Sequence, residues 1–328
     1  MSDSAPGSSG LRAEQYLAPE TIGQLGSFEL RARMIAEGVM SGQHRSPYQG
    51  LAVEFAEHRQ YVPGDDLRHL DWKVYGRSDK LHLKQYQQET NLDIVLLVDC
   101  SASMRFGTLR VKSGWGGTDA SRNTTMWTKF DHATAIAAAL CYLGLQQRDR
   151  VGLALFADGL RAQVKRSNAR DTWRRVVRTL ATEPVSEPTD LRKTADQALA
   201  SVQNRSLFIL VSDLLAPIDA IREMVARFRH RRHDLLLLQV LDRQELRFDL
   251  DEAAPFEDLE GGDRLDVDPR VVREDYLDAL TRHCGELERI ARSHGHDYLR
   301  LDTHGSVGPA IASMLGRRRM LARGGRWS

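Results

Sequence analysis

One stretch of the chain, residues 92–104, constrains the fold more than any other. Its apolar part, residues 94–98, is short and rich in β-branched side chains, which is typical of a strand buried on both faces within a parallel sheet. Three oxygen-bearing side chains, Asp99, Ser101 and Ser103, follow directly. In doubly wound sheets, ligands bind at the carboxyl ends of the strands. We therefore expect these three side chains to line a binding site.

These three residues admit two interpretations. One carboxylate and two hydroxyls spaced two residues apart can direct three hard oxygen atoms toward one point, and such a ligand set suits Mg²⁺ or Ca²⁺ better than zinc. Asp and Ser are also preferred at the N-cap of a helix, and a helix is expected soon after Ser103. The residues alone leave metal binding and helix capping both open.

Downstream of this stretch, predicted strands alternate with predicted helices. Apolar runs indicate strands at 150–156, 206–213, 234–241 and 298–302, a short edge strand at 161–165 and a hairpin within 246–267. Apolar residues at helical spacing indicate helices at 128–146, 168–181, 191–202, 218–230, 271–292 and 307–321. This alternation predicts an α/β domain over residues 91–328, built on a doubly wound, mostly parallel sheet of the Rossmann type.

The part of the chain before this domain has a different pattern. Residues 1–17 are mostly small and polar and are predicted to be a disordered lead. Residues 18–90 are predicted to form an extension with a helical segment at its start and strands at 51–62 and 81–86. Because residues 83–92 lack the composition of a linker, we expect the extension and the α/β domain to behave as one unit.

Two further segments leave a choice between a structural and a functional role. The interleaved charges of Glu54, Arg59, Arg68 and Asp71 can form a structural salt-bridge corner, which we favour, or an active site. Residues 105–123 contain too many glycines for regular structure, and they can form either a lid over the strand-end site or a simple surface loop.

Charge and cysteine content limit the classes of partner. The 328-residue chain has 46 Lys and Arg against 45 Asp and Glu, so its net charge of +1 gives no electrostatic reason to expect nucleic acid or membrane partners. The cysteines Cys100, Cys141 and Cys284 form no CxxC pair, which indicates reduced core thiols. No apolar run reaches the roughly 20 residues of a membrane helix. We expect a cytoplasmic protein without membrane insertion.

Two later strand-end loops carry further oxygen ligands, Thr189 within a Thr-Asp-Leu sequence and Asp213 as the last residue of the strand at 206–213. Together with the Asp-x-Ser-x-Ser sequence from Asp99 to Ser103, they resemble the metal-ion-dependent adhesion site of von Willebrand factor A domains. The resemblance implies that Asp99, Ser101 and Ser103 bind Mg²⁺ directly, with Ca²⁺ or Mn²⁺ as alternatives. It implies that Thr189 and Asp213 bind the ion directly or through water.

A second resemblance concerns residues 54–72, which contain Glu-Phe, then Arg-x-Tyr-x-Pro-Gly-Asp-Asp-x-Arg, then Asp-Trp. This sequence is similar to the signature of the uncharacterised family called domain of unknown function fifty-eight. Members of that family are often associated with MoxR-type AAA+ ATPases. The resemblance implies a MoxR-type AAA+ ATPase as the partner of this chain.

The sequence gives little support to an enzyme. It contains no GxxxxGK[ST] phosphate loop, no GxSxG elbow and no HExxH motif. The alternative is a serine-dependent hydrolase using Ser101 or Ser103, for which His132 is the nearest downstream base in the sequence. We expect instead a non-enzymatic, Mg²⁺-dependent protein–protein interaction module that acts as an adaptor or co-chaperone of a MoxR-type AAA+ ATPase.

Overall fold

The computed structural model describes residues 58–60, 75–76, 81–84, 92–110, 126–181, 185, 187–250, 254–257, 259 and 264–308. The chain divides into two compact units, of which one comprises residues 43–91 and the other the remainder. In the smaller unit, strands β1 (His58–Gln60) and β2 (His82–Lys84) pair antiparallel. Each lies within one of the two segments predicted to form a strand there.

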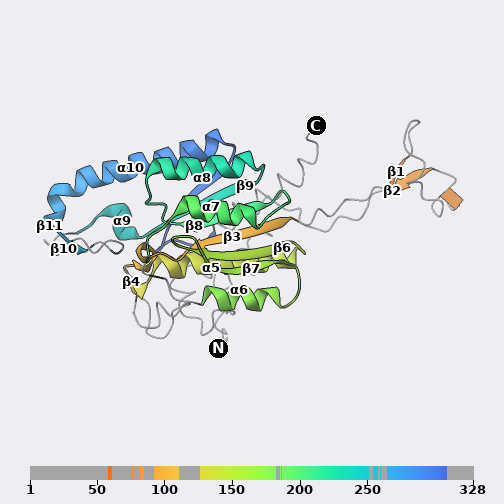
Figure 1. Ribbon diagram of the computed structural model, residues 1–328, viewed down its shortest axis with the longest axis horizontal. Coiled ribbons are helices and arrows are strands. Elements are labelled where there is room, and N and C mark those ends of the chain that lie inside the picture. Colours follow the sequence, from red (N-terminus) through yellow and green to blue (C-terminus); the bar gives the residue numbers. More distant parts are fainter. Residues whose placement is uncertain are drawn as a thin grey trace, which may run out of the picture. The chain divides into compact units, whose positions relative to one another are not determined.

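The larger unit is built on a six-stranded sheet with the order β12-β9-β8-β3-β6-β7 (Figure 1). Its strands are β3 (Asp93–Asp99), β6 (Arg150–Phe156), β7 (Leu160–Ser167), β8 (Leu207–Ser212), β9 (Asp234–Leu241) and β12 (Asp297–Asp302). All neighbouring strands pair parallel except β7, which lies antiparallel to β6 at one edge. The mostly parallel sheet predicted from the sequence is confirmed.

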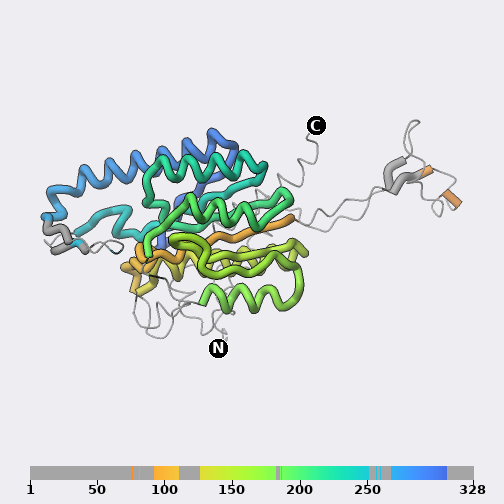
Figure 2. Tube along the Cα trace, in the orientation of Figure 1, coloured from red at the N-terminus to blue at the C-terminus, as the bar shows by residue number. Residues whose placement is uncertain are grey.

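The chain winds outward from the middle of this sheet in both directions. It runs from β3 to β6 and β7, then returns to the other side of β3 for β8, β9 and β12, as the colour sequence of Figure 2 shows. The order therefore reverses between β3 and β8. In a doubly wound sheet such a switch point opens a crevice between the two strand ends, where ligands bind.

Burial on both faces explains why β3 has an unbroken apolar sequence. Successive side chains of a strand point to opposite faces. Ile94, Leu96 and Val98 belong to the hydrophobic cluster on one face of the sheet. Val95 and Leu97 belong to the cluster on the other face.

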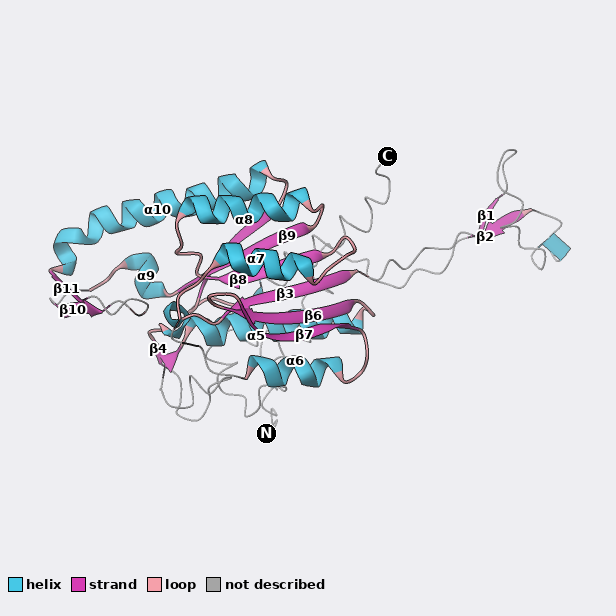
Figure 3. Ribbon diagram, in the orientation of Figure 1, coloured by secondary structure: helices cyan, strands magenta, loops and turns pink. Residues whose placement is uncertain are grey.

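Helices cover both faces of the sheet (Figure 3). The first layer contains α5 (Lys129–Gln146) and α6 (Thr172–Leu180), whose apolar side chains pack into the same cluster as Leu96. The second layer contains α7 (Leu191–Ala200), α8 (Ile218–His230) and α10 (Pro269–Ser293), which pack into the same cluster as Leu97. The predicted helices of these layers are confirmed, with ends that shift by a few residues.

Six short elements lie near the carboxyl ends of β3 and β9. A 3-10 helix, η3 (Ala102–Arg105), follows β3, and β4 (Leu109–Arg110) then pairs antiparallel with β5 (Met126–Trp127). The prediction that residues 105–123 lack regular structure was wrong for this first part, because two residues suffice to pair with the chain returning before α5. After β9, the short helix α9 (Arg243–Arg247) precedes the antiparallel strands β10 (Ala254–Glu257) and β11 (Arg264–Val267), which confirm the predicted hairpin.

Several predictions lie outside the described residues. They concern the lead at 1–17, the helical segment that follows it, the corner around Glu54, Arg68 and Asp71, the part of the insertion from residue 111 to 123 and nearly all of the closing helix at 307–321. Within the described residues, no helix has both the length and the apolar character needed to cross a membrane. The three cysteines are buried and free, as predicted.

Candidate metal centre

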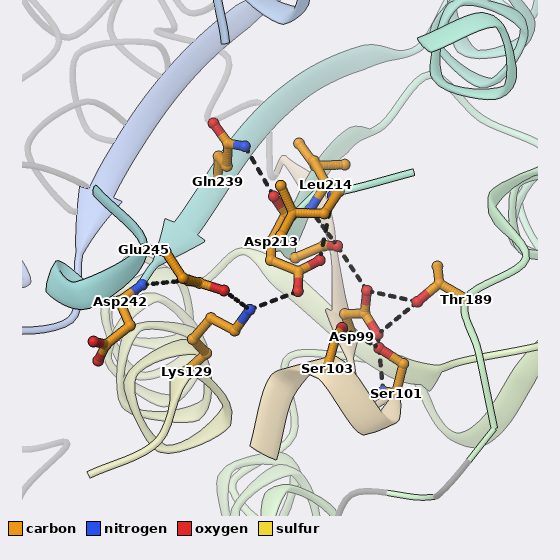
Figure 4. A network of polar contacts seen from close by, with 12 residues as sticks. Asp99, Ser101, Ser103, Lys129, Thr189, Asp213, Leu214, Gln239, Asp242 and Glu245 are labelled. Carbon is orange, nitrogen blue, oxygen red and sulfur yellow. Dashed lines mark hydrogen bonds and ion pairs between the residues drawn. The ribbon is translucent and has the colours of Figure 1, made fainter. Parts of the chain in front are cut away.

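The switch point of the sheet brings the polar ends of β3 and β8 together. Val98 of β3 pairs with Val211 of β8 in parallel register, so Asp99 and Ser212 end neighbouring strands at the same edge. Asp99 has no exposed surface, and Asp213 is 4% exposed. The two carboxylates predicted to share a site therefore lie in one buried cluster, shown in Figure 4.

The Asp99 carboxylate accepts hydrogen bonds from three chain segments. The backbone N–H of Ser101 donates to Oδ1 at 2.9 Å, and the Ser212 hydroxyl donates to Oδ2 at 2.6 Å. The Thr189 hydroxyl, from the loop before α7, donates to Oδ2 at 3.1 Å. The structure thus places Thr189 beside Asp99, although 90 residues separate them.

The hydroxyls of Ser101 and Ser103 do not cap a helix. Ser101 occupies the N-cap position of η3, but its side chain makes no capping hydrogen bond. Its Oγ instead lies 3.2 Å from Oγ of Ser103. Helix capping, which the sequence left open for these residues, therefore does not explain the two serine side chains.

At the start of α7, helix capping and contact with the site are likewise carried out by different residues, Asp190 and Thr189. Asp190 caps α7, because its carboxylate accepts from the backbone N–H of Lys193 at 2.9 Å. The Thr189 hydroxyl instead contacts Asp99.

Sequence reasoning missed Lys129, the first residue of α5. Its Nζ lies 2.8 Å from Asp213 Oδ2 and 2.8 Å from Glu245 Oε1, and the Lys129 side chain is 1% exposed. The other oxygen of Glu245 accepts from the backbone N–H of Asp242 at 2.7 Å, within the capping box that begins α9. The available signal was a cation in the first helical turn, where the helix dipole disfavours positive charge.

Ser212 was also absent from the predicted site. Its hydroxyl bridges the site, because it donates to Asp99 and accepts from the backbone N–H of Leu214 at 3.0 Å. The sequence analysis assigns a role to Asp213 alone at the end of this strand. Nothing in the sequence shows that the last residue of β8 points toward Asp99 across the switch point.

The pKa values of the three carboxylates shift in different directions because their surroundings differ. Burial and then the nearby Asp213 raise the pKa of Asp99 to about 6, against the hydrogen bonds from Ser212 and Ser101. Burial also acts to raise the pKa of Asp213, but the Lys129 ammonium and a hydrogen bond from Ser103 hold it below its usual range. Burial raises the pKa of Glu245 despite its contact with Lys129.

The donor set fits a hard divalent cation. It consists of carboxylate and hydroxyl oxygens, while the thiol of the intervening Cys100 bonds to the carbonyl of Phe156. Across the described residues, no group of three or more His, Cys, Asp or Glu side chains could hold a metal by itself, so the hydroxyls are needed to complete a ligand set. Neighbouring ligands of an octahedral Mg²⁺ at about 2.1 Å lie about 3 Å apart. The 3.2 Å between the two serine Oγ atoms is compatible with that separation.

The raised pKa of Asp99 makes a prediction about stability without divalent ions. The folded state holds this proton up to a pKa of about 6, against 3.8 for an ordinary Asp. This contribution to the free energy of unfolding is therefore fully present below about pH 3.8 and is lost as the pH rises through about 6. The expected loss is about 3 kcal/mol. Urea denaturation of wild type and Asp99→Asn in EDTA, at several pH values, measures it.

The difference in free energy of unfolding between wild type and Asp99→Asn separates the effect of Asp99 from the effects of other titrating groups. Burial lowers the pKa of His132 to about 4, so His132 destabilises the fold as the pH falls, but it does so in both proteins. The wild type minus Asp99→Asn difference should decrease between about pH 4 and pH 6. A difference independent of pH would show that Asp99 ionises as easily in the folded as in the unfolded chain.

The structure does not join His132 to the two serines. His132 is fully buried, its Nδ1 lies 3.4 Å from the Trp127 indole N–H that donates to it, and its Nε2 has no hydrogen-bond partner. The Ser101 hydroxyl pairs with that of Ser103. The base that the alternative hydrolase mechanism requires is therefore not in place at His132.

Comparisons with known proteins cover most of this chain. A family model described as "Protein of unknown function DUF58" matches residues 57–286. An uncharacterised protein of Mycobacterium tuberculosis (strain ATCC 25618 / H37Rv) is 30% identical over 291 residues, which is 87% of this chain and 86% of that protein.

The solved structures that resemble the chain are more distant. The conserved hypothetical protein BatB from Bacteroides thetaiotaomicron aligns with 71% of this chain and 99% of its own, at 14% identity and a TM-score of 0.45. The VWA domain of SpRpn10 aligns with 69% of this chain and 95% of its own, at 8% identity and a TM-score of 0.37. The strand order of the six-stranded sheet defines the fold.

Proposed function

Because this chain belongs to the family of proteins of unknown function DUF58, and residues 57–286 of the match include every residue of the centre, we propose a function from the site itself. The protein is an Mg²⁺-dependent protein–protein interaction module rather than an enzyme. The observation that carries this proposal is the pairing of the Ser101 and Ser103 hydroxyls beside the buried Asp99 carboxylate, with neither hydroxyl used to cap a helix.

Each residue has a distinct part in this proposal. Asp99, Ser101 and Ser103 hold Mg²⁺ directly, and Thr189 and Asp213 do so directly or through water; Ca²⁺ or Mn²⁺ are the alternative ions. The bound ion supplies a coordination position that a carboxylate of another protein can occupy.

The charges around the site favour such a carboxylate. The Lys129 ammonium lies between the carboxylates of Asp213 and Glu245, so it offsets part of their combined negative charge. An ion held mainly by Asp99 and uncharged hydroxyls keeps positive character. A partner's Asp or Glu would then gain a charge-assisted contact that depends on the metal.

We assign the partner from the sequence resemblance of residues 54–72. It is a MoxR-type AAA+ ATPase, whose nucleotide hydrolysis supplies the work that this chain, acting as an adaptor or co-chaperone in the cytoplasm, cannot perform. The site residues provide recognition and no chemical step.

A pull-down with a purified MoxR-type ATPase tests this function. Binding is expected in millimolar Mg²⁺ and is expected to be lost in EDTA and in the double variant Ser101→Ala/Ser103→Ala, because each change removes the ion or its ligands. A matched control, Ser167→Ala/Ser201→Ala, removes two hydroxyls at the ends of β7 and α7 and should bind as wild type does. Equal binding of wild type and Ser101→Ala/Ser103→Ala in Mg²⁺ would refute the mechanism.

A further inference from the structure

A pocket of about 830 Å³ extends from the proposed metal centre toward the β10–β11 hairpin and the start of α10. Its polar end includes Ser103, Thr189 and Asp213 of the centre. Away from the centre its wall is mainly apolar and includes Leu215, Phe248 and Leu259. We call this space the apolar pocket. This volume lies within the usual range for pockets that bind drug-sized ligands, and such a ligand is as large as several side chains.

The wall of the apolar pocket exposes large hydrophobic side chains. Among the described residues, four large hydrophobic side chains are exposed, and two of them, Leu215 and Leu259, line this pocket with exposed fractions of 47% and 49%. Phe248, which also lines the pocket, stacks on Phe256 and on Tyr276, with ring centroids 5.9 Å and 4.4 Å away. Exposed apolar side chains gathered around a concavity mark a binding surface.

The backbone next to Leu215 is held in a strained conformation. Leu214, which follows Asp213, has a φ of 53°, an unfavourable conformation for a residue with a bulky side chain. Hydrogen bonds on both sides hold it there, because its N–H donates to Ser212 Oγ at 3.0 Å and its carbonyl lies 2.7 Å from Nε2 of His283. A strained backbone conformation that the surrounding structure holds in place is characteristic of binding sites. It fixes the loop that carries both Asp213 and Leu215.

The charges of the apolar pocket select the kind of occupant. Its charged lining residues are Lys129, Asp213 and Glu245, which form one ion-paired cluster at the polar end. Since both neighbours of the Lys129 ammonium are carboxylates, it is not available to hold an acidic ligand. An acid is therefore attracted to this end only when a metal ion is bound there, whereas the remaining wall favours an apolar group.

We propose that the apolar pocket holds a large apolar side chain from the same partner segment whose Asp or Glu reaches the metal ion. The partner segment is thus recognised by a carboxylate and an aromatic or aliphatic side chain together. This inference rests on the proposed function and specifies the ligand of that site.

Selection from a random-peptide phage library in millimolar Mg²⁺ tests the inference. Peptides that bind only with Mg²⁺ are expected to carry an Asp or Glu together with a Phe, Leu, Ile, Met or Trp. Their affinity, measured by fluorescence anisotropy, should fall about tenfold or more in Leu215→Ser/Leu259→Ser, because two apolar contacts are lost. Val271→Ser, which changes an exposed valine outside the pocket lining, should alter it less than about twofold.

Calorimetric titration with Mg²⁺ separates this inference from the proposed function. Both exposed-leucine substitutions should leave Mg²⁺ affinity unchanged. Wild type that takes up no Mg²⁺ contradicts the proposed function itself. Normal Mg²⁺ uptake with peptides that show no apolar preference, or that bind Leu215→Ser/Leu259→Ser as tightly as wild type, overturns only the inference. If the selection yields no peptide but decanoate binds in Mg²⁺, the inference is also overturned. The occupant of the pocket is then a small amphiphile.

Discussion

Replacing Lys129 by methionine should lower the free energy of unfolding by about 3–5 kcal/mol in the presence of EDTA. Methionine preserves most of the side-chain length and removes the charge. Asp213 and Glu245, both within 2.8 Å of the ammonium, would then be buried without their counter-ion and close to the Asp99 carboxylate. Removing one partner of a buried ion pair lowers the free energy of unfolding strongly, because the remaining charge stays buried without its counter-ion.

Millimolar Mg²⁺ should recover part of this loss. A divalent cation at the centre replaces the missing positive charge, so Mg²⁺ is expected to stabilise Lys129→Met more than it stabilises wild type. Urea denaturation of both proteins, with EDTA and with Mg²⁺, measures the effect.

Two variants control for the charge change. Lys129→Met/Glu245→Gln removes one of the two stranded carboxylates and should be more stable than Lys129→Met. Arg222→Met breaks the exposed pair with Asp219 and should cost at most about 1 kcal/mol. A Lys129→Met protein as stable as wild type in EDTA would show that the buried ion pair is not needed to balance the carboxylates.

Replacing Asp99 by alanine should reduce Mg²⁺ affinity by more than about 100-fold, since loss of even an outer-shell partner can cost 10–100-fold. Asp99 is the carboxylate on which the Ser101, Thr189 and Ser212 hydrogen bonds converge. The fold should persist. The lost hydrogen bonds, about 1–3 kcal/mol, are offset because a carboxylate with a pKa of about 6 is itself unfavourable when ionised at neutral pH.

Asp190→Ala is the matched control for this substitution. It removes a carboxylate one residue from Thr189, but that carboxylate caps α7, so its loss should cost about 1 kcal/mol of stability and leave Mg²⁺ affinity unchanged. Calorimetry on both variants makes the comparison. Unchanged Mg²⁺ affinity in Asp99→Ala would eliminate the metal assignment, whereas gross unfolding would make Asp99 a structural residue.

The sequence sufficed to predict the sheet because each central strand is buried on both faces. Such a strand needs a nearly continuous apolar run, as in β3, β8 and β9, and these runs have few alternative structures. The positions of the residues at the ends of these strands could be predicted for the same reason. Once β3 and β8 are parallel neighbours, Asp99 and Asp213 must lie at one edge of the sheet.

The ion pairs of the site could not be predicted in this way. Lys129 contacts Glu245 across 116 residues, and the short helix α9 that carries Glu245 has no apolar periodicity to announce it. The sequence likewise does not decide whether Asp190 or Thr189 caps α7, since both side chains can accept a hydrogen bond at the start of a helix. Long-range polar contacts depend on the final packing, while apolar periodicity is local.

A crystal of the protein soaked in Mn²⁺, which shares the oxygen-rich octahedral preference of Mg²⁺, tests the central claim most directly. We predict one anomalous difference peak at the switch point, about 2.1 Å from oxygens of Asp99, Ser101 and Ser103. Mn²⁺ bound only elsewhere, with the switch point still held by the hydrogen bonds to Asp99 and the ion pair of Lys129 with Asp213, would contradict the account.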